Sequence, residues 1–213
     1  MKALGMIEVY SFTTAVCVAD LCAKTSDVKV IAFDRNRPIS PDVPAPLVMV
    51  VKIEGDTSSV QSAVEAGVAY AKSKGKYIVS HIIANPGEDM EKMGYLMDIN
   101  KDKYNKNLPK SFYGQEVEEK NTKAIGLLEV QGLVASIEGL DSMLKSAEVR
   151  LVHTEKRLGG RLVTLIVTGT VSAVNAAIEN GSVSASTLGQ VYGSEVIARP
   201  HSEVTKFFDF EIE

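Results

Sequence analysis

The chain has 213 residues, 45% of them hydrophobic and 23% charged, and a formal net charge of −4. This composition excludes intrinsic disorder, which requires low hydrophobicity and high net charge. Lys and Arg number 23 against 27 Asp and Glu, so no overall basic field favours nucleic acid as a partner. An acid follows the first apolar residues and no run of 18 apolar residues occurs, so we expect neither export nor a membrane span.

The pattern of residues 1–98 predicts six elements in the order strand, helix, strand, strand, helix, strand. Apolar residues at helical spacing predict a first helix that is capped by Thr13 or Thr14 and ends near Thr25. β-branched runs bounded by turn residues predict the strands. These strands are expected over Leu4–Tyr10, Val28–Phe33, Leu47–Ile53 and Tyr77–Ile83.

The second helix has the clearest pattern in this part of the chain. Its apolar residues recur three and four positions apart from Val60 to Ala71, and Asp56, Thr57 and Ser58 precede them as cap candidates. The apolar stripe is narrow and consists of small residues. We therefore expect this helix to pack closely on the sheet.

Residues 88–123 are unusually charged, with 15 charged side chains in 36 residues. Met90, Met93 and Met97 lie at helical spacing within them, which favours a short helix that covers the first domain, although a methionine stripe can also form an adaptable binding surface. We expect a first domain over 1–98, a charged linker over 99–122 and a second domain over 123–213.

The second domain repeats the first. Residues 3–9 (ALGMIEV) return as residues 124–130 (AIGLLEV), at an offset of 121. Beyond Gly55 the matches continue at an offset of 114, through Gly169 and the apolar stripe of the second helix. The chain is therefore a duplication, and we predict an α/β (α+β) fold made of two tandem βαββαβ units of ferredoxin-like topology.

The change of offset means that the first copy holds seven extra residues. They fall between Asp34 and Pro46, where four of the seven prolines are gathered. Proline fixes φ and removes an N–H donor, so we expect an irregular, stiff connection at this place.

The residues that could carry chemistry are few. Cys17 and Cys22 are too few for a disulfide framework or a thiolate metal cage, and we expect them to be small buried hydrophobes. His81, His153 and His201 lie far apart and have no neighbours at metal-ligand spacing. No glycine-rich phosphate or dinucleotide motif occurs. We therefore expect no enzyme activity, no metal and no cofactor.

The repeated openings, the Asp-x-x-x-Lys of each first helix and the sequence Ile-Ala-Arg-Pro-His at 197–201 together resemble bacterial microcompartment shell proteins. Two copies in one chain resemble the tandem-domain branch, and the last strand of each copy keeps its unpermuted place. The resemblance implies a homotrimer that forms a pseudohexagonal tile of a shell in the bacterial cytoplasm, together with other shell proteins.

The resemblance also assigns residues to the edge of the tile. Lys24 and Lys145 match the family's edge lysine, which crosses the seam between neighbouring tiles, and Asp20 and Asp141 precede them by four residues. The alternative is an ordinary i,i+4 ion pair on an exposed helix. Arg199 matches an edge arginine, although the first copy has Asn85 at that place.

The connection between the second and third strands lines the pore in this family. We predict a weakly positive opening that favours small anionic metabolites. The alternative is that its glycines and prolines only form an ordinary turn, as these residues commonly do. Some tandem relatives hold an iron–sulfur cluster there through a loop cysteine, which is missing here. The expected pore residues are Arg35, Asn36, Arg37, Pro38, Ile39 and Ser40 in the first copy and Arg157, Leu158, Gly159, Gly160 and Arg161 in the second.

A second reading of the sequence remains open. The same duplicated unit could form a soluble oligomer that binds or senses a small molecule between its subunits and builds no larger array. Assembly into sheets or tubes at high protein concentration distinguishes the two functions.

Overall fold

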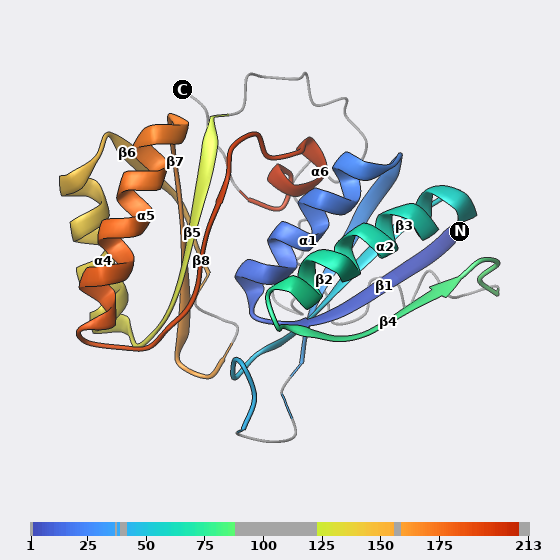
Figure 1. Cartoon of the computed structure of the whole chain (residues 1–213), viewed down its shortest axis with the longest axis horizontal. Coiled ribbons are helices and arrows are strands. Elements are labelled where there is room, and N and C mark those ends of the chain that lie inside the picture. Colours follow the sequence, from blue (N-terminus) through green and yellow to red (C-terminus); the bar gives the residue numbers. More distant parts are fainter. Residues whose placement is uncertain (1, 37, 39–41, 88–122, 156–158, 209–213) are drawn as a thin grey trace, which may run out of the picture. The chain divides into compact units, whose positions relative to one another are not determined.

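The computed structural model describes residues 2–36, 38, 42–87, 123–155 and 159–208 (Figure 1). The chain divides into two compact units, Met1–Glu116 and Val117–Glu213. The division falls between residues 88 and 122, outside the described residues, so the domain limits at 98 and 122 stay predictions, as does the helix expected around Met93.

Unit 1 contains the six elements that the sequence predicts. Its strands lie within two residues of the expected ranges, except that the second strand continues three residues further. In chain order the elements are β1 (Ala3–Tyr10), α1 (Phe12–Thr25), β2 (Val28–Asn36), β3 (Val48–Gly55), α2 (Thr57–Ser73) and β4 (Tyr77–Ile83).

Unit 2 repeats the order of these six elements, and a helical turn follows its last strand. Its elements are β5 (Ala124–Gln131), α4 (Leu133–Ser146), β6 (Val149–Glu155), β7 (Leu162–Gly169), α5 (Val171–Ser186), β8 (Val191–Ile197) and α6 (Ser202–Thr205).

Each unit has one four-stranded antiparallel sheet with the same strand order. The order is β2-β3-β1-β4 in unit 1 and β6-β7-β5-β8 in unit 2. The pairing of Gly5 with Ile53 returns as Gly126 with Val167, and the bulge at Glu8/Val9 returns at Glu129/Val130. The duplicated α+β fold with βαββαβ topology is thereby confirmed.

Matched glycines let the second helix of each unit approach its sheet closely. A Cβ added at Gly5 would lie 2.8 Å from Val60 of α2, and one added at Gly126 would lie 2.6 Å from Ile178 of α5. The narrow stripe of small residues predicted for these helices is therefore used for close packing against the central strand of the sheet.

The seven extra residues of unit 1 lie where the sequence places them. The connection from β2 to β3 is 11 residues long against 6 between β6 and β7, and β2 itself has 9 residues against 7 in β6. Five of the seven residues thus lengthen the connection, and two lengthen the strand before it.

The predicted cap of the first helix is wrong. α1 begins at Phe12, so Thr13 and Thr14 lie inside it, and its N-cap Ser11 makes no side-chain cap bond. The chain instead turns through a positive φ of 78° at Ser11, as it does through 104° at Gly132 before α4. A backbone turn, which a search for capping side chains does not detect, starts both helices.

Candidate functional site

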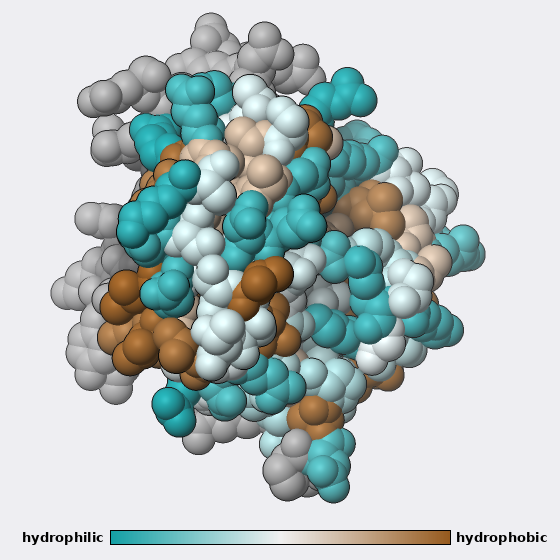
Figure 2. Space-filling view, turned by 60° about the vertical axis from the view of Figure 1, so that its left-hand side comes forward, coloured by the Kyte–Doolittle hydropathy of each residue, from teal (hydrophilic) through white to brown (hydrophobic). Residues whose placement is uncertain are grey.

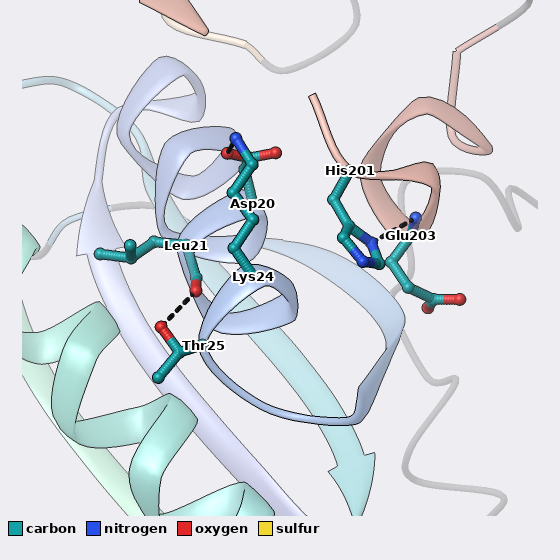
Figure 3. Close-up of polar contacts among 6 residues, drawn as sticks. All are labelled: Asp20, Leu21, Lys24, Thr25, His201 and Glu203. Carbon is teal, nitrogen blue, oxygen red and sulfur yellow. Dashed lines mark hydrogen bonds and ion pairs between the residues drawn. The ribbon is translucent and has the colours of Figure 1, made fainter. Parts of the chain in front are cut away.

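The aspartate and lysine of the predicted tile edge form an ion pair on α1. Lys24 Nζ bonds to Asp20 Oδ2, and one residue further along the helix Thr25 Oγ1 donates to the carbonyl oxygen of Leu21 over 2.7 Å (Figure 3). The side chain of Asp20 is 8% exposed and that of Lys24 is 38% exposed. The lysine therefore reaches the surface while its partner stays buried.

The matched pair on α4 is more open. Lys145 Nζ lies 2.6 Å from Asp141 Oδ2, with side-chain exposures of 75% and 52%. The hydrogen bond to Asp141 raises the pKa of Lys145, so the ammonium group stays charged. Both i,i+4 ion pairs that the sequence allows are present, and a role of the lysines across a seam between tiles stays a prediction.

The outer faces of α1 and α4 differ in exposure although the two helices occupy matched positions in their units. α4 exposes Leu133 (62%), Ile137 (60%) and Leu144 (46%), which lie on one side of the helix. At the offset of 121, the corresponding residues of α1 are Phe12, Val16 and Ala23, and all three are buried. We call Leu133, Ile137 and Leu144 the α4 stripe.

Unit 2 exposes further apolar side chains outside the α4 stripe. Val134 of α4 is 71% exposed and Val183 of α5 is 65% exposed. Figure 2 turns forward the side of Figure 1 that carries α4 and α5, and it shows apolar side chains gathered in patches among hydrophilic ones. A large exposed apolar patch on a protein usually marks a site that binds another molecule.

The connection between β6 and β7 is tied to the end of β5. Gly159 (φ 96°), Gly160 (φ 63°) and Arg161 (φ 60°) all have left-handed backbone. The N–H of Gly132 donates to the carbonyl oxygen of Arg161 over 2.9 Å, and the Gln131 side chain donates to that of Gly160 over 3.2 Å. The two predicted glycines thus hold the returning chain against the strand.

In unit 1 the corresponding connection returns to the same end of the sheet. The N–H of Ser11, which follows β1, donates to the carbonyl oxygen of Leu47 over 3.0 Å. Arg35 and Asn36 are exposed at the end of β2. Of the other predicted pore residues, Pro38 is half-buried, whereas Arg37, Ile39, Ser40, Arg157 and Leu158 lie outside the described residues.

One charge that the sequence assigns to the loop belongs to the sheet instead. Asp34 lies inside β2, is buried and forms an ion pair with Lys52 of β3, and each of the two side chains is 10% exposed. Burial raises the pKa of Asp34, and the bond to Lys52 opposes that rise. Asp34 therefore does not reduce the positive charge of the connection.

The other polar residues singled out in the sequence have ordinary structural surroundings. Arg199 is exposed beyond β8, and His201 caps α6 by accepting from the N–H of Glu203 over 3.1 Å (Figure 3). His153 Nε2 lies 3.8 Å from Glu155 Oε2. Among the described residues no three His, Cys, Asp or Glu side chains are grouped as metal ligands would be.

The two cysteines are buried, as expected. Burial raises the pKa of Cys22 to about 12, and its Sγ donates to the carbonyl oxygen of Ala63 over 3.2 Å. A thiol with so high a pKa is a poor nucleophile. Among the described helices none is long and apolar enough to cross a membrane.

Replacement of Gly132 by Ala tests the turn that precedes α4. A Cβ at this position would meet only the Arg161 guanidinium, 3.8 Å away, so the backbone φ of 104° determines the cost. We expect a loss of about 1–3 kcal/mol in the free energy of unfolding, measured with urea. Gly87→Ala serves as the control, since nothing lies within 4 Å of that position. Equal losses in the two variants would show that the turn carries no strain.

Comparison with known proteins places both units in one family. Residues 3–86 and 124–200 each match the BMC domain. The carboxysome assembly protein CcmO of Synechococcus sp. is 34% identical over 203 residues, 93% of this chain, and the chain spans 65% of the length of that relative.

A second relative corresponds to one unit only. The bacterial microcompartment shell protein PduA of Citrobacter freundii is 49% identical over 84 residues, which are 39% of this chain and 89% of PduA. The match to a crystal structure of a microcompartments protein from Desulfitobacterium hafniense covers 97% of this chain and 99% of that one, with 23% sequence identity and a TM-score of 0.38. The chain belongs to the BMC-domain family of bacterial microcompartment shell proteins, and it carries the domain twice.

Proposed function

We propose that the protein is a structural tile of a bacterial microcompartment shell, formed by three chains that together present six similar domains around one axis. The observation that carries the proposal is the α4 stripe, an exposed apolar face whose counterpart on α1 is buried. Relatives that are named as shell and carboxysome assembly proteins support the same role.

The unequal burial of the two helices favours a ring. A duplicated chain presents two related but different faces, so copies join head to tail rather than by one self-complementary patch. Head-to-tail contacts form a closed ring when the rotation from one copy to the next divides a full turn evenly. Three chains of two similar domains give six similar positions, and each α4 stripe is then covered by the next chain.

The edge of the tile follows from the two lysines. Lys24 and Lys145 stand at matched positions of α1 and α4, and Lys145 is exposed and bonded to Asp141. A long cation with three N–H donors suits a seam at which the same patch occurs on both sides. We propose that the two lysines, with Arg199 beyond β8, make the contacts between tiles.

The variant Lys24→Ala/Lys145→Ala tests this seam. Each lost i,i+4 ion pair weakens its helix by only about 0.2–0.5 kcal/mol, so we expect trimers to persist while extended sheets or tubes no longer form at high concentration. Electron microscopy of concentrated samples measures the arrays. Lys2→Ala/Lys29→Ala removes the same charge away from both helices and is expected to leave them intact. Arrays formed equally by both variants would contradict the seam.

The centre of the ring is the proposed pore. Arg35 of unit 1 and Arg161 of unit 2 are exposed at the same end of their sheets, beside the connections that would approach the axis. Their positive charge supports a preference for small anionic metabolites. The proposed setting is a shell in the cytoplasm, built together with other shell proteins.

A further inference from the structure

Unit 1 carries a concentrated positive charge at the turn between α2 and β4. Lys72, Lys74 and Lys76 occur within five residues, and no acidic residue occurs between Tyr70 and Tyr77. Lys72 and Lys74 are exposed, and Lys76 is half-buried. We call these three lysines the basic turn.

The backbone of the basic turn is well defined. The N–H of Lys76 donates to the carbonyl oxygen of Ala71 over 3.0 Å, and Gly75, with a φ of 64°, reverses the chain. This arrangement is the Schellman ending of a helix. It brings three lysines onto one tight bend rather than along an extended surface.

Two tyrosines position the lysine side chains. The Nζ of Lys72 lies 5.0 Å from the ring centre of Tyr77, and that of Lys74 lies 5.4 Å from the ring centre of Tyr70. Both distances are within the range of cation–π attraction. Tyr77 is itself bonded to Ser80 through their side-chain oxygens over 3.1 Å. The ammonium groups are thereby held near the turn.

Helix termination does not account for this charge. The C-terminus of a helix carries roughly half a negative charge, which one lysine more than offsets. α5 ends at the equivalent place in unit 2 with no basic residue in its last turn, where the matched residues are Ser186, Leu188 and Gln190. The fold therefore forms without these lysines, and about two positive charges exceed what α2 needs.

The basic turn lies at the end of the sheet where the β2–β3 connection also lies. The N–H of Tyr10 at the end of β1 donates to the carbonyl oxygen of Lys76 over 2.9 Å, and the next residue, Ser11, bonds to Leu47 of the connection. Figure 1 shows the turn between α2 and β4 at the end of unit 1 from which this connection extends.

We infer that the basic turn is a binding site for small multivalent anions, of the class of pyrophosphate or polycarboxylates, with one site per chain. Three ammonium groups on one bend match the charge of such an anion. That the site concentrates these anions beside the axial opening rests on the proposed function. Unit 2 has no equivalent, so a trimer would carry three such sites rather than six.

A nucleic acid is the less suitable ligand. A phosphate backbone is held by many cations spaced along a groove, whereas the positive charge here is confined to one turn of a chain with a net charge of −4. A small ligand fits a site of this size. Binding of an oligonucleotide is therefore an outcome that the experiment must distinguish.

Titration calorimetry with pyrophosphate on the full-length protein at low ionic strength tests the inference. We expect one site per chain in the wild type, with affinity reduced by about tenfold or more in the variant Lys72→Gln/Lys74→Gln/Lys76→Gln. The control Lys2→Gln/Lys29→Gln/Lys123→Gln loses the same charge at exposed positions elsewhere and is expected to bind as the wild type does.

Three results would overturn the inference. The first is binding that persists in the basic-turn variant, and the second is an equal loss in the control, which would indicate net charge alone. The third is tighter binding of a single-stranded oligonucleotide than of pyrophosphate. Because the site lies within one chain, a monomeric protein that binds pyrophosphate would contradict only the proposed assembly, and a trimer that does not bind it would contradict only this inference.

Discussion

The variant Leu133→Glu/Ile137→Glu is expected to be a folded monomer. Both side chains lie on the α4 stripe, more than half exposed in the single chain and covered by the next chain in the proposed ring. Removing a carboxylate from water without a partner costs several kcal/mol, and two such groups in each contact exceed what an interface of ordinary strength supplies. Analytical ultracentrifugation measures the mass, and circular dichroism measures the fold.

Val183→Glu is the matched control for this experiment. Val183 on α5 is 65% exposed, as apolar as the residues of the stripe, but its counterpart in unit 1 is Ala69, which is exposed as well. Val183 therefore does not belong to the surface that is exposed in unit 2 and buried in unit 1. The variant is expected to keep the mass of the wild type. If the stripe variant kept that mass, the exposed face of α4 would not be the contact between chains.

The variant Lys52→Met is expected to lose about 3 kcal/mol in the free energy of unfolding of unit 1 at pH 7. Lys52 and Asp34 form an ion pair in which each side chain is 10% exposed, so the substitution leaves a buried carboxylate without this cation. Breaking a buried pair by removing one partner costs about 3–5 kcal/mol, and slight exposure places this pair at the lower end. Urea unfolding at equilibrium measures the change.

The same variant has a defined dependence on pH. The pKa of Asp34 is raised by burial above its ordinary value of 3.8, so the folded state holds the proton more tightly than the unfolded state. The stability contributed by Asp34 therefore falls as the pH rises from 3.8 through the folded pKa. Without Lys52 that pKa rises further, and the loss relative to the wild type should shrink as the pH falls from 7 towards 5.

A second substitution separates the charge from the packing. Asp34→Asn/Lys52→Met removes both charges and is expected to recover most of the stability at pH 7, with little dependence on pH. In unit 2 the residue at the place of Lys52 is Ile166, which shows that the fold accepts an apolar side chain there. A Lys52→Met variant as stable as the wild type would mean that the pair contributes nothing to unit 1.

Most of the architecture could be predicted because each element can be recognised twice, once in each copy of the repeat. The strand Tyr77–Ile83 has the bounds that the sequence predicts, and the offset of 114 carries these bounds to Val191–Ile197, where the structure has them. The change of offset also places the seven extra residues correctly. The second strand was expected to end at Phe33, yet it continues to Asn36. Three polar residues resemble the start of a loop, and the burial of Asp34 depends on a cation that lies 18 positions away in the chain.

The exposed face of α4 could not be predicted. α1 and α4 have similar apolar patterns, and periodicity alone does not say which of two matched helices is left uncovered. The edge ion pairs, in contrast, follow from spacing alone, since residues four apart on a helix lie on one side. Their part in a larger array depends on copies of the chain, which the pattern of one chain does not contain.

The central claim is that three chains form one closed ring of six similar domains. Single-particle electron microscopy of the wild-type protein, averaged without imposed symmetry, tests it most directly. We expect a flat particle of about 69 kDa, three times 22.9 kDa, with threefold symmetry and six lobes around an axis. A monomer, or a twofold dimer with the α4 stripe exposed, would contradict it.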